Sequence, residues 1–215
     1  MKGMPRMIGI LGAACILVMG PVDVSAEVFI DIYAGHAKTD TGKADITGNV
    51  GGIAASGDVA YDSSFTVGGR VGGWIGKYFG VGLDVFHFDS DLKNTSIEQG
   101  NLGIAFDLMA RLPLLANEGM PHGRLQPYVT VGPAIFVSDQ KSPGFTDGQS
   151  ASVGFKGGAG LKFLFTKHFG LFGEYRYTYF KSTQDFETTG FAPTTGELTQ
   201  RIGTHHFVGG VAIHF

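Results

Sequence analysis

The seven histidines of this chain are the side chains best suited to catalysis or metal binding. His87 stands just before Asp89 and Ser90, which would place an acid and a hydroxyl beside a general base. A base next to a hydroxyl can activate it as a nucleophile. Polar residues at the end of a strand are more often simply solvated, so we expect no catalytic residue here.

His205 and His206 form the second setting of interest, an adjacent pair that raises the question of a metal site. Neighbouring residues on a strand point to opposite faces, so this pair is poorly placed to share one ion. No His-x-His spacing supports it, and the one cysteine, Cys15, stands far away near the start. We therefore predict no metal and no cofactor, and expect His206 to join a polar interior.

The segments that must position these residues alternate apolar side chains with small or polar ones, a pattern that predicts β-strands. Turn residues separate them, and after residue 26 no apolar run is long enough for a spanning helix. Eight such segments cover residues 28–37, 63–76, 79–89, 101–114, 125–138, 152–165, 169–182 and 204–215.

The connections between these segments differ in length. Residues 77–78 and 166–168 are hairpin turns, and residues 115–124 form a somewhat longer turn. The other connections are long and polar, and cover residues 38–62, 90–100, 139–151 and 183–203. Short turns at one end and long loops at the other are typical of β-barrels in the outer membrane.

The alternation also assigns two faces to the strands. One face collects an apolar set of positions without Asp, Glu, Lys or Arg, which includes Val67, Val81, Leu108, Val131, Leu161 and Phe207. The other collects nine charged residues, with glycines between them that we expect to make room for long charged side chains. The nine are Asp31, Arg70, Asp84, Asp107, Arg111, Lys156, Lys162, Glu174 and Arg176.

A closed barrel in lipid accounts for both faces. Strands in a bilayer must close, because each unpaired backbone group in hydrocarbon costs several kcal/mol. A Lys or Arg facing lipid costs about 2 to 4 kcal/mol at the midplane, so the charged face belongs inside. Eight strands leave an interior that side chains fill. We therefore predict an all-β protein, an eight-stranded antiparallel up-and-down transmembrane β-barrel with paired charges inside.

The start of the chain predicts export. Lys2 and Arg6 precede the apolar run 7–20, and small residues end at Ala26, as in a secretory signal peptide. The apolar run is shorter than the roughly 17 to 25 residues of a spanning helix. Cys15 leaves open a lipoprotein signal. We predict a signal peptide at residues 1–26, cleaved after Ala26, and one barrel domain at residues 27–215.

The end of the chain carries apolar residues at alternate positions and a terminal aromatic: Phe207, Val211, Ile213 and Phe215. This pattern resembles the C-terminal signal by which outer-membrane barrels reach the barrel-assembly machinery. Together with the Glu-Tyr-Arg-Tyr stretch at residues 174–177, the mature chain resembles the OmpA/OmpX-like family of small eight-stranded outer-membrane barrels. The resemblance implies a Gram-negative outer-membrane location, with lipid and lipopolysaccharide as neighbours.

The expected function is that of a structural, surface-exposed barrel with no wide pore and no enzymatic activity. A partner outside the cell would bind through the loops, where Phe145, Phe186 and Phe191 are candidate contacts; nothing in the charge balance suggests nucleic acid. Three alternatives remain: an enzyme that modifies lipopolysaccharide, a narrow or lateral channel for small molecules, and a soluble ligand-binding barrel of lipocalin type. Lipid A deacylases resemble His-x-Ser, and no histidine here has serine two places later.

Overall fold

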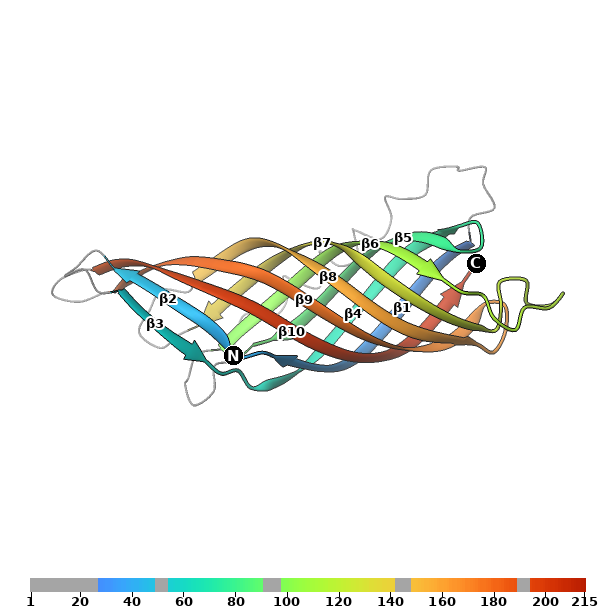
Figure 1. Cartoon of the computed structure of the whole chain (residues 1–215), viewed down its shortest axis with the longest axis horizontal. Helices are drawn as coiled ribbons and strands as arrows, with labels where there is room; N and C mark the ends of the chain where they lie inside the picture. Colours follow the sequence, from blue (N-terminus) through green and yellow to red (C-terminus); the bar gives the residue numbers. More distant parts are fainter. Residues whose placement is uncertain (1–26, 49–53, 91–97, 142–147, 189–193) are drawn as a thin grey trace, which may run out of the picture.

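The structure, a computed structural model, describes residues 27–48, 54–90, 98–141, 148–188 and 194–215. These residues form ten β-strands in one antiparallel sheet (Figure 1). The strands are β1 (Glu27–Thr39), β2 (Gly42–Gly48), β3 (Ala54–Val59), β4 (Ser63–Ile75), β5 (Phe79–Asp89), β6 (Glu98–Arg111), β7 (Leu125–Lys141), β8 (Gly148–Leu164), β9 (Phe169–Thr188) and β10 (Thr194–His214). Among the described residues there is no helix long and apolar enough to cross a membrane.

Eight of the strands close into a barrel. The order runs β1-β4-β5-β6-β7-β8-β9-β10, and β1 pairs back with β10 from Phe29↔His214 to Thr39↔Thr204. Every pairing joins neighbours in an up-and-down order, so closure leaves no open edge within the barrel. The prediction of an eight-stranded antiparallel barrel is confirmed.

The sheet continues beyond the barrel at the end where the longer connections lie (Figure 1). Past Thr204, β10 leaves β1 and pairs with β2, and β2 pairs with β3. β9 and β10 also stay paired with each other out to Thr188↔Thr194. The prediction that residues 38–62 and 183–203 are loops was therefore wrong over much of their length, because both segments extend the sheet as strands.

Side chains alternate between a buried face and an exposed face along each barrel strand. The exposed face carries large apolar residues from every strand, such as Ile32, Phe106 and Val131, at 54–60% exposed. Exposed aromatic rings stand near both ends of this surface, with Phe79 and Phe215 at the short turns and Phe65 and Phe207 at the opposite end. Aromatic rings at two levels are typical of the two interfaces of a membrane.

Glycines on the inner face make room mainly for aromatic rings. The prediction that they make room for charged side chains holds only in part. A Cβ at Gly103 would lie 2.3 Å from the ring of Phe86, and one at Gly160 would lie 2.6 Å from the ring of Tyr128. Such distances are far shorter than van der Waals contact. The interior is thus packed with rings as well as charges.

Gly132 is required by a close approach of two strands. A Cβ there would lie 1.6 Å from the carbonyl oxygen of Phe106 on β6. The next residue, Pro133, has no N–H to donate, and the register between β6 and β7 is interrupted between Ala105↔Ala134 and Leu108↔Val131. Glycine and proline at such a break are typical of a local distortion in a strand.

Candidate functional site

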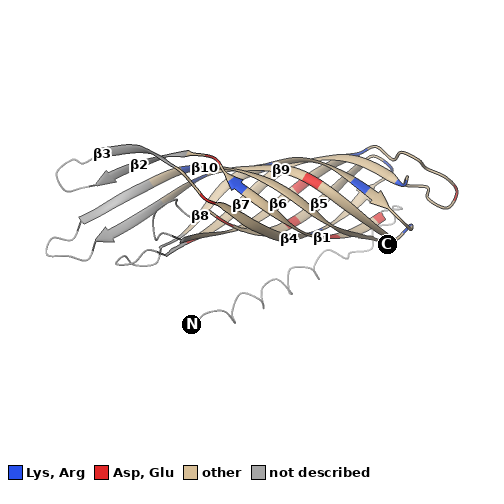
Figure 2. Cartoon of the chain, turned by 90° about the horizontal axis from the view of Figure 1, so that it is seen from below, with Lys and Arg blue, Asp and Glu red and all other residues tan. Residues whose placement is uncertain are grey.

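All nine charged residues singled out from the sequence lie inside the barrel, each at most 4% exposed. Figure 2 shows basic and acidic positions interspersed along the strands. Eight of them form one connected group, here called the central network: Asp31, Arg70, Asp84, Asp107, Lys156, Lys162, Glu174 and Arg176.

Arg70, on β4, joins three carboxylates of the central network. Its Nη2 donates to Asp31 Oδ2 and to Glu174 Oε2, both at 3.0 Å. Its Nη1 lies 3.7 Å from Asp107 Oδ2. The hydroxyl of Tyr128 also donates to Glu174 Oε2, at 2.7 Å. Burial of these carboxylates is tolerable because each has a cation and a hydrogen bond.

Arg176, on β9, joins a second group of partners. Its Nη1 donates to Asp84 Oδ2 at 3.1 Å and to the hydroxyl of Tyr33 at 2.6 Å, and its Nη2 lies 2.8 Å from Glu174 Oε1. Lys156 bridges Asp84 and Asp107, the latter at 2.6 Å. Glu174 thus has Arg70 on one oxygen and Arg176 on the other, which connects both groups.

A third group closes the interior at the short-turn end, and its acid is Glu27. Arg111 Nη2 and His214 Nδ1 both contact the Glu27 carboxylate. Lys162 connects this group to the central network, because its Nζ lies 2.9 Å from Asp31 Oδ1 and 3.2 Å from His214 Nε2. With Glu27 included, the buried charges number five acids and five bases.

Sequence reasoning missed Glu27 because the first strand was started one residue later, at Val28. Its parity is that of Asp31, so the alternation already placed it on the inner face. Without it the nine residues comprise four acids and five bases. The missing acid is thus the one that makes the buried charges balance.

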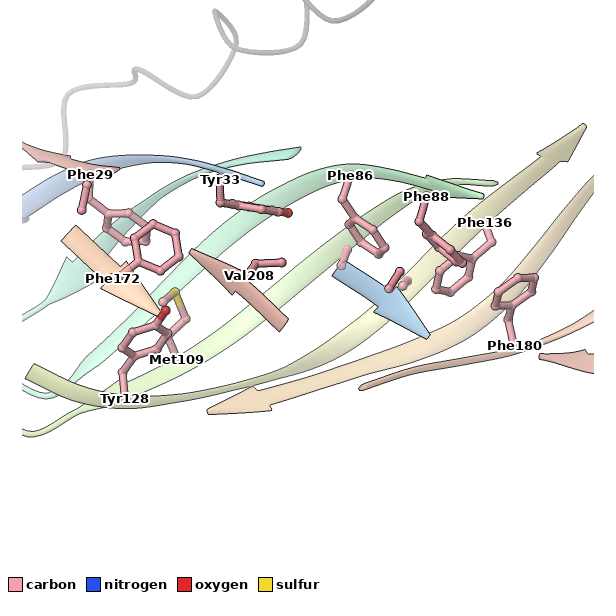
Figure 3. Packing of buried hydrophobic residues seen from close by; sticks show 14 of the residues in the cluster. Phe29, Tyr33, Phe86, Phe88, Met109, Tyr128, Phe136, Phe172, Phe180 and Val208 are labelled. Carbon is pink, nitrogen blue, oxygen red and sulfur yellow. The ribbon is translucent and has the colours of Figure 1, made fainter. Parts of the chain in front are cut away.

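An aromatic layer lies beyond the central network toward the long-loop end, because Phe86 and Phe88 follow Asp84 along β5. Figure 3 shows the phenylalanine rings of this layer near one another. The layer consists of Phe86, Phe88, Phe136 and Phe180, with the imidazole of His206. Phe136 stacks on Phe180 with ring centroids 4.1 Å apart, and His206 meets Phe88 edge to face at 4.9 Å. The sequence predicted His206 inside but not these rings. Phe86, Phe88 and Phe180 nevertheless have the parity of the inner charged residues on their own strands. Phe136 pairs with Gly103, which has the parity of Asp107 on β6.

In both histidine settings, the alternation of the strand places the residues in question on opposite faces of the barrel wall. His87 Nε2 lies 3.2 Å from Asp89 Oδ1 on the outside, but Ser90 is buried and its hydroxyl accepts from Asn101 inside the barrel. The hydroxyl thus lies on the wrong face for His87 to activate it. Likewise, His206 faces inward, hydrogen-bonded to Thr178 at 3.0 Å, and His205 faces outward.

The remaining predicted residues are the C-terminal apolar set and the loop phenylalanines. Phe207 and Phe215 are exposed on the outer face, and Phe215 N donates to Val28 O at 2.9 Å. Val211 and Ile213 lie on the same strand, β10, and are partly exposed. Of the loop candidates, Phe145 and Phe191 lie outside the described residues. Phe186 falls on β9, opposite Gly196, but its side chain is outside the described part.

At the level of the central network, the described side chains that point into the lumen are almost completely buried. Charges inside and apolar residues outside are the inverse of a lipocalin-type barrel, which carries its apolar face inside. Within the described residues, no cluster of three or more His, Cys, Asp or Glu side chains is arranged to hold a metal ion. The candidate site is therefore a lumen lined by buried charged side chains.

A closed eight-stranded barrel with an apolar exterior between two aromatic levels belongs to the class of membrane-spanning β-barrels. The chain belongs to the outer membrane protein beta-barrel domain family, whose sequence model matches residues 30–215. That family places it in the bacterial outer membrane. No curated protein matches the chain in sequence.

Solved structures of similar fold are outer-membrane proteins. OprG from Pseudomonas aeruginosa is 16% identical with a TM-score of 0.66, over 89% of this chain and 96% of that one. Neisserial surface protein A is 16% identical with a TM-score of 0.58, over 87% and 97%. AlkL, determined in lipid bilayers, is 15% identical with a TM-score of 0.54, over 92% and 94%. At these identities the likeness shows the fold alone.

Proposed function

We propose that this protein is a closed structural barrel of the outer membrane that displays its long-loop end at the cell surface. The observation that carries this proposal is the filled lumen, where ten buried charged side chains balance as five acids and five bases. An aromatic layer closes the same lumen nearer the long loops. Eight strands leave too little width for an aqueous channel once such side chains fill it.

The extension of the sheet supports surface display. Short turns of outer-membrane barrels face the periplasm and longer connections face outward. The outward end of this barrel continues into β2, β3 and the paired ends of β9 and β10. A partner outside the cell would meet this extension first, and loops or strand ends are where binding residues are usually carried.

An enzymatic role on lipopolysaccharide has less support. Its best candidate set was His87, Asp89 and Ser90, and the serine hydroxyl is buried inside the barrel while the other two lie outside. We therefore propose that the barrel has no hydrolytic activity of its own.

Solute flux through reconstituted barrels tests the closed lumen. The refolded chain, residues 27–215, is incorporated into liposomes, and uptake of small sugars is compared with empty liposomes and with a 16-stranded porin. We expect uptake at the level of empty liposomes. Uptake approaching that of the porin, or steady unit conductance in a planar bilayer, would contradict the proposal.

A variant with Phe136→Ala and Phe180→Ala tests which of the two layers, the aromatic layer or the central network, closes the lumen. It removes the stacked pair from the aromatic layer and leaves the central network intact. We expect it to stay impermeable, because the salt-bridged level closes the lumen independently. Flux in this variant alone would show that the rings, not the charges, seal the barrel.

We also infer that Phe207, Val211, Ile213 and Phe215 act as an assembly signal for the barrel-assembly machinery. In support, Phe207 and Phe215 are exposed on the outer face of β10, available to another protein before lipid covers them. Deleting Phe215 should reduce the heat-modifiable barrel in outer-membrane fractions while leaving synthesis and export unchanged. Assembly at the wild-type level would remove this role.

A further inference from the structure

Basic residues lie in register on the outer face of the sheet, on the long-loop side of the exposed aromatic rings. Arg201 on β10 lies directly opposite Lys181 on β9. On the other side of β10, Lys38 on β1 lies opposite His205. The side chains of Lys38, Lys181 and Arg201 are exposed on the outside of the sheet, and these three residues are here called the basic patch.

The basic patch has no neutralising partner in the part of the chain whose side chains the structure describes. Among the described side chains, none forms an ion pair with Lys38, Lys181 or Arg201. Asp40 is close in sequence, but its carboxylate is engaged by His205 Nε2 at 3.2 Å. Two like charges directly opposite on neighbouring strands destabilise a sheet. Within the described side chains, the Arg201–Lys181 pair therefore costs stability unless an anion lies between them.

His205 separates the two parts of the basic patch and is held in place. Its Nδ1 lies 2.6 Å from the hydroxyl of Tyr175, and its Nε2 faces Asp40. From His205 to Arg201 is four residues, or about 13 Å along an extended strand. Because Lys38 lies opposite His205, the patch offers cations at two points about four residues apart along β10.

The position of the basic patch matches the level of lipid headgroups. On β10 the outward positions run from Phe207, which is 59% exposed, through His205 to Arg201. On β9 they run through Tyr177 to Lys181. Aromatic rings mark the membrane interface, so the cations follow at the height where headgroup phosphates lie.

The basic patch extends only a short distance along β9 and β10 toward the long-loop end. Four positions beyond the Arg201–Lys181 pair, the register places Glu197 opposite Asp185. The charge therefore changes sign along the same pair of strands. A basic level confined to the interface fits a ligand fixed in the membrane better than one arriving from solution.

We propose that Lys38, Lys181 and Arg201 bind the phosphate groups of lipopolysaccharide in the outer leaflet. An arginine guanidinium can hold a phosphate through two hydrogen bonds, and a lysine adds a mobile point charge. Phosphate between Arg201 and Lys181 would relieve their repulsion. This inference rests on the proposed function only in taking the long-loop end as the cell-surface end.

The test is binding of lipopolysaccharide to the refolded full-length mature chain in neutral detergent, followed by native mass spectrometry. The test variant is Lys181→Gln with Arg201→Gln. The matched control is Lys77→Gln with Arg124→Gln, which also removes two exposed bases but at the short-turn end. Each basic residue near an anionic lipid surface contributes about 1 kcal/mol, so the test variant should bind at least tenfold more weakly.

A second arm uses lipopolysaccharide from which the phosphates have been removed. The wild-type chain should bind it as weakly as the test variant binds the intact lipid. This arm needs no substitution, so it remains informative if the variant fails to refold. The control variant should keep wild-type affinity for intact lipid.

Equal binding by the wild-type chain and the test variant, equal loss in the control variant, or equal affinity for the dephosphorylated lipid would each overturn the basic patch as a phosphate site. Solute flux measured on the same preparations keeps the two proposals apart. Flux with phosphate-dependent binding intact refutes the closed lumen alone, and absent flux without such binding refutes the basic patch alone.

Discussion

The central network and the aromatic layer fill the same lumen, but different forces hold them. In the central network each carboxylate depends on two or more cations, as Asp84 depends on Lys156 and Arg176. In the aromatic layer, Phe136 and Phe180 pack through ring contact and carry no charge. Replacement of a ring by a smaller apolar side chain leaves only a cavity, whereas removal of a basic side chain leaves a buried carboxylate without its partner. The comparison predicts that the charged half is much less tolerant of substitution.

Arg176→Met should have the largest effect. It removes the guanidinium from Asp84 and Glu174 and from the hydroxyl of Tyr33. Breaking a buried ion pair by removing one partner typically costs about 3 to 5 kcal/mol. We expect a loss of this size in the free energy of unfolding, measured by urea titration in detergent. Arg124→Met, on the exposed surface of the short-turn connection, is the control and should change stability by less than about 0.5 kcal/mol.

Lys156→Met tests whether the network acts as coupled charges. Alone it should destabilise the barrel by about 3 kcal/mol, because Asp84 and Asp107 both lose their ammonium partner. Adding Asp107→Leu should recover about 1 kcal/mol or more, since one unpaired carboxylate is then gone. If the double variant is as unstable as the sum of both single variants, the charges are not coupled.

Phe136→Leu should have the smallest effect of the three. Exchange for a smaller apolar side chain costs about 1 to 2 kcal/mol, because packing against Phe180 and Phe86 is reduced without leaving a charge. The same urea titration measures it. A loss as large as that of Arg176→Met would remove the distinction between the two layers.

The faces of the barrel strands were predictable from the sequence, and the partners within the lumen were not. Alternation of side chains assigns Arg70 and Glu174 to the inner face without any structure. Their contact joins residues 104 positions apart, across the barrel. Such a contact depends on how the strands are staggered when the sheet closes, and no local pattern encodes that stagger.

The strands beyond the membrane were missed for a different reason. β2 and β3 contain glycine, threonine, serine and alanine, without a sustained apolar face. Strand prediction from alternation depends on one face being apolar. The sequences of β2 and β3 have no such face, so the signal that identified the barrel strands is absent there.

The inner aromatic rings, by contrast, could have been found. Phe86 and Phe88 share the parity of Asp84 on β5, and Phe172 and Phe180 share that of Glu174 on β9. The same parity rule that found the charges would have predicted a mixed interior.

The most direct test of the account is the environment of single spin labels, one on the outer face of β7 and one in the connection that precedes this strand. Residues 27–215 contain no cysteine, so a label can be placed on this part of the chain at Val131 or at Glu118 in the short-turn connection. In bilayers, the label at Val131, whose native side chain is 57% exposed, should collide with lipid-soluble oxygen and be protected from a water-soluble nickel complex. The label at Glu118 should show the reverse. Nickel access at Val131 equal to that at Glu118 would contradict a barrel that turns its apolar face to lipid.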